Sequence, residues 1–141
     1  MDVRQAFTSR SLSSLTKVFP DTELTEKPVN SGSALLHETY SFQVAYKGSQ
    51  LMKHIRVRIS SDMNENISVR SVGLVPSELP TYHDHDDIIL RSTPGLFPDP
   101  LYPIDDIEGI TAFPGQWRSI WVTVNVDESA VPGIHDIKIV F

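Results

Sequence analysis

The sequence predicts an all-β fold, a two-sheet antiparallel β-sandwich of immunoglobulin-like type. Two observations support this prediction. Ten prolines and seven glycines are scattered among short Val, Ile and aromatic runs, which suits strands and turns and argues against long helices. The apolar runs also alternate with polar residues and are separated by turn signals, giving about seven strands. A closed barrel is the main competing architecture. At 141 residues, the chain can form one domain around one core.

Residues 1–33 are rich in Ser, Thr and charged residues, and we treat them as an N-terminal segment that precedes a β-sandwich domain over 34–141. Within that segment, the apolar run Leu15–Phe19 is stopped by Pro20 and predicts one edge strand. Pro28–Ser33 is expected to be a loop.

Period-two alternation begins after residue 35. Tyr40, Phe42, Val44 and Tyr46 share one face of a predicted half-buried strand. A second strand is expected over 55–60, where Ile55, Val57 and Ile59 alternate with polar residues. A polar connection over 61–66 leads to a third strand over 67–75, with a bulge near Ser71-Val72 where the alternation slips.

The chain from Pro76 to Pro114 is rich in proline, which interrupts ladder hydrogen bonds. We expect a long ordered loop there, with only short strands such as Asp87–Arg91. Trp117–Val126 and Ile134–Phe141 then predict a closing hairpin-like pair, with Ile137, Ile139 and Phe141 facing inward. Because chain ends are usually polar and frayed, an apolar end in strand rhythm indicates a module of a longer protein.

Twelve basic and eighteen acidic residues give a net charge of −6, so no broad positive field is available for a nucleic acid or an anionic membrane surface. No apolar run approaches the roughly 20 residues that a transmembrane helix needs. The first ten residues lack the apolar stretch of a secretory signal, and we therefore expect a cytoplasmic location. The chain has no cysteine, which excludes disulfides and thiolate metal sites.

Four motifs in the last third of the chain carry a family resemblance: Gly95–Pro103, Phe113–Gln116, Trp121–Val124 and Ala130–Gly133 followed by Ile137–Ile139. In this order and spacing they resemble the N-terminal β-sandwich module that precedes the barrel in glycoside hydrolase family 123 and in related uncharacterised glycosidases. The resemblance covers roughly residues 34–141 and is strongest over 95–141.

The resemblance implies a domain that packs against a catalytic (β/α) barrel of the same parent chain, in enzymes that hydrolyse N-acetylhexosaminides with help from the substrate's own acetamido group. The family's catalytic pair is an adjacent Asp-Glu on the barrel. Asp127-Glu128 lies in a predicted turn of the sandwich and is not equated with that pair. No catalytic residue carries over, and no cofactor is implied.

A metal site could start only at the run His83–Asp87, where His83, His85 and Asp86 are weak candidate ligands. In an extended segment the two histidines point to one side and Asp84 and Asp86 to the other, so few ligands converge. We expect a solvated loop and no metal.

Aromatic residues are the candidates for carbohydrate binding or domain packing: Trp117, Trp121, Phe97 and Tyr102. Trp117 and Trp121 share one face of their strand, and Ile120, Val122 and Val124 occupy the other. If the valine face packs on the core, both indoles are displayed outward as platforms for sugars or partner domains. The alternative is that Trp121 belongs to the core and only Trp117 is exposed.

Acidic residues elsewhere have structural explanations. Asp99, between two prolines, is expected to be a turn residue that bonds nearby backbone amides, and Asp105-Asp106 with Glu108 a solvated loop without calcium-loop spacing.

Three functions remain open. The first is a non-catalytic accessory domain of a larger glycoside hydrolase, not an enzyme in isolation, whose loops between Pro76 and Pro114 shape one rim of the sugar cleft. The second is a carbohydrate-binding module that uses exposed aromatics. The third is a structural or adhesion-type sandwich with protein partners.

Overall fold

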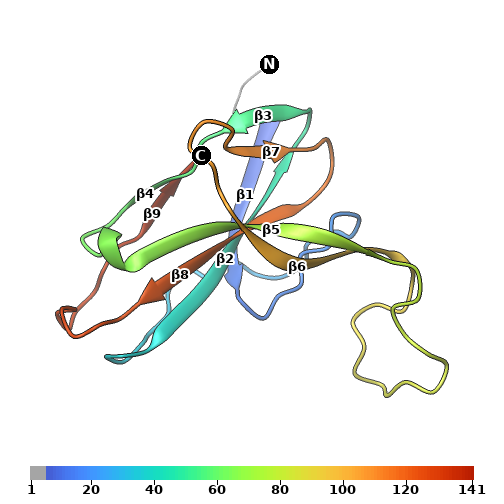
Figure 1. Cartoon of the computed structure of the whole chain (residues 1–141), viewed down its shortest axis with the longest axis horizontal. Helices are drawn as coiled ribbons and strands as arrows, with labels where there is room; N and C mark the ends of the chain where they lie inside the picture. Colours follow the sequence, from blue (N-terminus) through green and yellow to red (C-terminus); the bar gives the residue numbers. More distant parts are fainter. Residues whose placement is uncertain (1–5) are drawn as a thin grey trace.

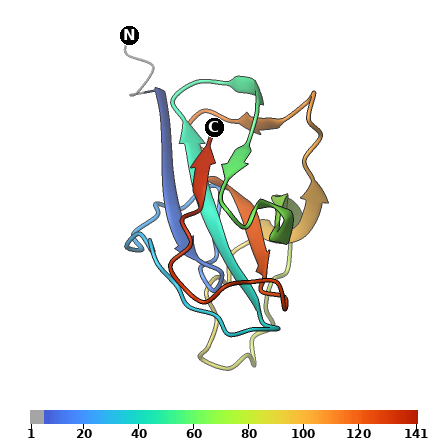
Figure 2. The same cartoon turned by 90° about the vertical axis from the view of Figure 1, so that its left-hand side faces the viewer.

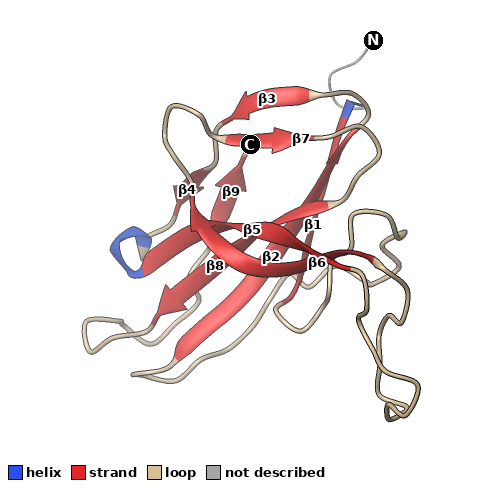
Figure 3. Cartoon of the chain, turned by 45° about the vertical axis from the view of Figure 1, so that its right-hand side comes forward, coloured by secondary structure: helices blue, strands red, loops and turns tan. Residues whose placement is uncertain are grey.

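The computed structural model describes residues 6–141 and confirms the predicted all-β antiparallel sandwich (Figure 1, Figure 3). The immunoglobulin-like type stays a prediction. The chain forms these elements in order: β1 (Phe7–Ser13), β2 (Thr39–Gly48), β3 (Met52–Ile55), β4 (Arg58–Ser60), the 3-10 turn η1 (Asn64–Asn66), β5 (Ile67–Ser77), β6 (Gly95–Pro103), β7 (Ile110–Ala112), β8 (Arg118–Asn125) and β9 (Lys138–Val140).

One layer is a five-stranded antiparallel sheet in the order β1-β2-β8-β5-β6. The alternation predicted over residues 40–46 is confirmed in β2, which pairs with β8 so that Val44 lies opposite Ile120 and Phe42 opposite Val122. Because side chains alternate across a strand, these residues share the face that covers the core, and Gln43 and Trp121 share the outer face.

The opposite layer consists of two short ladders, β3–β7 and β4–β9. Figure 2 shows β4 and β9 in front of β2 and β8. The single strand predicted over 55–60 is wrong in its continuity, because the chain changes partner from β7 to β9 between Ile55 and Arg58. His54, at φ 57°, adopts the left-handed conformation just before this change. The predicted alternation itself holds, since Ile55, Val57 and Ile59 are less exposed than their polar neighbours.

The main core lies between the two layers. Val44, Tyr46, Ile120 and Val122 from the large sheet pack with Ile110 and Ala112 from β7. Phe141 packs against this core, as predicted, with its ring 5.8 Å from that of Tyr46. Burial raises the pKa of Tyr46 to about 12, because the ionised phenol cannot be solvated there.

A second apolar cluster covers the outer face of the large sheet at its β1–β2 end. Leu12, Ala45 and Trp117 lie on the sheet face. Val18 and Leu24 come from residues 14–26, which follow β1 and which we call the covering segment. The Arg10 side chain holds this segment in place, donating hydrogen bonds to the carbonyls of Leu24 (2.7 Å) and Glu26 (2.9 Å).

The predicted edge strand at Leu15–Phe19 is wrong. The edge strand of this region is β1, which ends at Ser13, just before the predicted position. Residues 1–5 of the predicted N-terminal segment lie outside the described residues. Leu15–Phe19 instead forms part of the covering segment, where Val18 is buried and Leu15 is exposed. The apolar residues of this run therefore pack on the face of a sheet. In the sequence alone, such a run cannot be distinguished from a short strand.

The predicted long loop over 76–114 is also wrong in part. Gly95–Pro103 forms β6, a nine-residue strand that pairs with β5, whereas Asp87–Arg91 is not a strand. Proline is compatible with β6 because the strand lies at the edge of the sheet. The β5–β6 register shifts between Val72 and Leu74, close to the predicted bulge. The ring of Tyr102 lies where a side chain at Gly73 would be.

The predicted hairpin of the last two strands is wrong as well, because β8 joins the large sheet and β9 pairs with β4 in the other layer. The connection between them is tied to the β4–η1 turn by His135, whose Nδ1 lies 2.8 Å from the Asp62 carboxylate. The hydrogen bond to the Val131 carbonyl and the pairing with Asp62 raise the pKa of His135. The described residues contain no helix long and apolar enough to cross a bilayer.

Candidate functional site

A hollow of about 190 Å³ opens on the outer face of the large sheet, beside the segment that covers its β1–β2 end. The indole of Trp121, from the central strand β8, lies in its lining. Val72 on β5 and Leu101 on β6, which are paired in register, add apolar wall. The polar part of the lining consists of Ser14, Thr16, Lys17, Gln43 and Asp99.

Strand register sets the neighbours of Trp121. Gln43 on β2 lies directly opposite it on one side and Arg70 on β5 on the other, so two polar side chains flank the indole on the same face. The buried Gln43 amide donates hydrogen bonds to the carbonyls of Ser13 (3.0 Å) and Thr16 (2.5 Å). The covering segment forms one wall of the hollow, and Gln43 therefore holds that wall in place.

A larger hollow of about 600 Å³ adjoins the first and shares Lys17 and Pro98 with it. It lies between Phe19 and Phe97 on one side and residues 78–94, the loop that joins β5 to β6, on the other. Tyr82 and Ile88 of this β5–β6 loop are part of its lining. Figure 1 shows this loop projecting from the sandwich. The two hollows are thus neighbours, and Lys17 and Pro98 border both of them.

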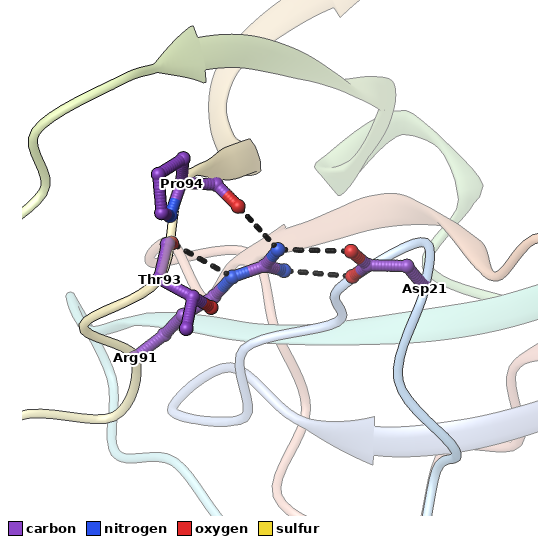
Figure 4. A network of polar contacts seen from close by, with 4 residues as sticks. All are labelled: Asp21, Arg91, Thr93 and Pro94. Atoms are coloured by element: carbon purple, nitrogen blue, oxygen red, sulfur yellow. Dashed lines mark hydrogen bonds and ion pairs between the residues drawn. The ribbon is translucent and has the colours of Figure 1, made fainter.

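Arg91 anchors the base of that loop (Figure 4). Its guanidinium makes a bidentate pair with the Asp21 carboxylate at 2.7 and 2.8 Å, and it also donates to the carbonyls of Thr93 and Pro94. The same group lies 5.2 Å from the ring centre of Phe19 and 5.4 Å from that of Phe97. The Arg91 hydrogen bonds lower the pKa of Asp21. We call this arrangement the Arg91 clamp.

Replacing Arg91 with lysine is expected to loosen the loop while leaving the sandwich folded. Lysine keeps the charge but not the planar fork that binds a carboxylate through two parallel hydrogen bonds. Hydrogen exchange should therefore accelerate at the amides of residues 78–94 and stay unchanged in β2 and β8. Arg58→Lys on β4 is the matched control, because Arg58 is exposed. Unchanged exchange in the loop of the Arg91 variant would show that the clamp does not hold it.

The loop held by the clamp exposes large apolar side chains. Leu79, Tyr82, Ile88 and Leu90 are all largely exposed, and Ile88 reaches 91%. Acidic side chains are interspersed among them at Glu78, Asp84, Asp86 and Asp87. Grouped apolar side chains of this kind on a protein surface are typical of interaction sites.

The two tryptophans differ from both predicted alternatives. The valine face of β8 does pack on the main core, so both indoles point to the outer face. Trp117 is nevertheless buried, at 4% exposure, because the covering segment packs over it. Only Trp121 is partly exposed and lines the hollow. The prediction that Trp117 is the exposed indole is therefore wrong.

The other two aromatic candidates, Phe97 and Tyr102, have different surroundings. Phe97 is part of the Arg91 clamp and packs edge-on against Phe19, with ring centres 5.5 Å apart. Tyr102 is exposed on β6 and lies outside both hollows. Trp121 thus lines the smaller hollow and Phe97 the larger one, and Tyr102 lies outside both.

The candidate metal residues do not assemble. Among residues 6–141 no group of three His, Cys, Asp or Glu side chains is placed to hold an ion, and the ring of His85 contacts the carbonyl of its neighbour Asp86 instead. His83, His85 and Asp86 are exposed on the projecting loop.

Asp99 is not the predicted turn residue, because it lies within β6 and lines the smaller hollow. Asp105 does cap its own loop, accepting hydrogen bonds from the amides of Ile107 and Glu108 at 2.8 Å, which lowers its pKa. Asp127 accepts similar bonds from Ser129 and from the Asn66 amide, with its carboxylate in an exposed turn.

Four residues of these hollows and of the clamp were not predicted from the sequence: Gln43, Lys17, Arg91 and Asp21. Gln43 carried a usable signal, because it is an amide in the middle of an alternating strand, opposite the apolar face. The Arg91 clamp carried none, since Asp21 and Arg91 are 70 residues apart and no pattern pairs them.

Comparison with known proteins identifies a likeness of fold. No protein-family model matches the sequence, and no curated protein matches it. Among solved structures, the chain is similar to a family 123 glycoside hydrolase from Clostridium perfringens, studied for its hydrolysis of glycolipid glycans, with a TM-score of 0.62 and 14% identity. The match covers 96% of this chain and 24% of that one. The resemblance predicted from the sequence motifs is thus confirmed at the level of the fold.

Proposed function

We propose that this chain is a non-catalytic accessory β-sandwich domain of a larger glycoside hydrolase, and that it packs against a catalytic barrel of the same parent protein. The observation that carries the proposal is the extent of the structural match: nearly the whole of this chain corresponds to about a quarter of a glycoside hydrolase, 96% against 24%. The motif resemblance over 95–141 supports the same assignment.

The projecting β5–β6 loop supports a packing role. Its apolar side chains, among them Tyr82, Ile88 and Leu90, are exposed in the isolated domain, and burying them against another domain would be favourable. The Arg91 clamp gives the loop a fixed base, so it does not have to be ordered at the moment of packing.

An activity assay tests the proposal. The isolated chain is expected to show no turnover of aryl N-acetylhexosaminides, because the catalytic acid pair of the resembling family belongs to the barrel. Hydrolysis that is present in the wild-type chain and disappears in Asp86→Asn or Asp99→Asn would overturn it.

A second measurement supplies a positive result. The gene that encodes this chain is expected also to encode a βα-repeat with an adjacent Asp-Glu pair. That portion, produced separately, should gain thermal stability when this chain is added. A gain that is lost with Ile88→Asp, but kept with Ile134→Asp outside the loop, would support packing through the loop, and no gain at all would contradict the proposal.

A further inference from the structure

We propose that the hollow around Trp121 is a carbohydrate-binding site that holds one residue of a neutral oligosaccharide, with the rest of the oligosaccharide lying along the larger hollow towards Phe97. This site is separate from the accessory role proposed above, which requires no ligand on this domain. It uses one of the two indoles expected from the sequence, Trp121, and combines it with residues of β5 and β6 that the sequence did not indicate.

Trp121 supplies the apolar contact. It is the partly exposed tryptophan of the outer face, since the covering segment buries Trp117. An indole offers a large rigid apolar face at low entropic cost, which suits the C–H face of a pyranose ring. Val72 and Leu101 beside it complete an apolar floor.

Polar groups around the indole match the edge of a sugar ring. Asp99 lines the same hollow, and a carboxylate can accept hydrogen bonds from hydroxyl donors through both of its oxygens. Lys17, Ser14 and Thr16 also line the hollow, and their side chains carry an ammonium group and two hydroxyls. A few converging polar groups over an apolar floor are typical of small-molecule sites.

The charges favour a neutral ligand. Lys17 and Asp99 have opposite signs and both line the smaller hollow, while Arg91 in the larger hollow is already paired with Asp21. Asp84 adds a negative charge to the lining of the larger hollow, which disfavours an acidic ligand. A hydroxyl-rich neutral chain finds both donors and acceptors in the smaller hollow. The larger hollow, at about 600 Å³, falls in the range of roughly 300–1,000 Å³ that ligand sites occupy.

The wall of the hollow is already in place before binding. Gln43 holds the Ser13 and Thr16 carbonyls through its amide, and Arg10 holds the covering segment further along at Leu24 and Glu26. A ligand therefore does not have to order this segment, which lowers the cost of binding.

Titration followed by NMR of the ¹⁵N-labelled chain tests the site, because the two indole N–H signals report separately on Trp117 and Trp121. The probes are cellotetraose, chitotetraose and mannotetraose, with tetragalacturonate as the acidic comparison. At least one neutral tetrasaccharide is expected to shift the Trp121 indole signal in a saturable way and to leave the Trp117 signal in place. Trp117→Phe assigns the two signals.

Variants decide the outcome. Trp121→Ala should weaken binding by about tenfold or more, as expected for a central aromatic contact, and Asp99→Asn should weaken it several-fold. Tyr102→Ala is the matched control, since Tyr102 is an exposed aromatic on the same strand as Asp99 but outside the hollow, and it should bind like wild type. The exposed position of Asp99 keeps its variant folded even if Trp121→Ala is unstable.

Three results would overturn the site: no saturable shift with any neutral tetrasaccharide, binding of tetragalacturonate alone, or unchanged binding in both the Trp121 and Asp99 variants. None of these results bears on the accessory-domain proposal, which is tested by packing and by the absence of turnover.

Discussion

Replacing Ile120 with alanine is expected to lower the free energy of unfolding by about 2–5 kcal/mol. Ile120 is fully buried, at 0% exposure, in the central strand β8. It packs with Val44, which lies opposite it on β2, and with Ala112 on β7 in the other layer. Loss of three carbon atoms there removes buried apolar surface and leaves a cavity that both layers would have to close.

Ile134→Ala is the matched control. The same three atoms are removed from a side chain that is 96% exposed, and the change should stay within about 0.5 kcal/mol. Urea unfolding of the three proteins, followed by far-UV circular dichroism, gives the comparison. Equal midpoints for the Ile120 variant and the wild type would show that the sandwich core is not centred on β8.

Replacing Trp117 with alanine is expected to cost about 3–5 kcal/mol and to release the covering segment. The ring is buried between the sheet and residues that follow β1, including Val18 and Leu24. Lys47 Nζ lies 4.7 Å from its centre, which adds a cation–π contact. Without the ring, the segment loses most of the surface on which it packs.

Trp121→Ala removes the same type of side chain from the same face of the sheet, four residues further along the chain, and so provides the comparison. It should cost less stability, because Trp121 is partly exposed. Limited proteolysis separates the two variants: new cleavage within residues 14–26 is expected only for Trp117→Ala. Cleavage at the same rate in both variants would contradict the assignment of Trp117 to the second apolar cluster.

The sequence was sufficient to predict the strands that obey simple alternation. Tyr40, Phe42, Val44 and Tyr46 repeat every two residues over a whole strand, and β2 forms there. The slip near Ser71-Val72 also predicted the irregular pairing of β5 with β6. In both places local periodicity and tertiary contacts require the same conformation.

Prediction failed where the tertiary partner decides the local structure. Prolines argued against a strand at Gly95–Pro103, but an edge position accommodates them. Consecutive strands usually pair, yet β8 and β9 belong to different layers, and no local signal distinguishes a hairpin from a crossing between layers.

The candidate site could be predicted only in part, because the exposure of its tryptophans depends on a tertiary contact. Strand periodicity correctly placed Trp117 and Trp121 on one face, but which of them is open depends on where the covering segment comes to rest. That position is fixed by hydrogen bonds from Arg10 and Gln43 to distant carbonyls, which the sequence does not reveal.

The prolines of β6 affect whether another chain can pair with this edge of the sheet. A free sheet edge offers amide donors to any extended chain, and this is how many β proteins polymerise. Pro98, Pro100 and Pro103 lack that donor, so the margin formed by β6 is a poor template for strand addition. The residues that conceal this strand in the sequence thus protect the folded molecule from sheet-to-sheet growth on that side.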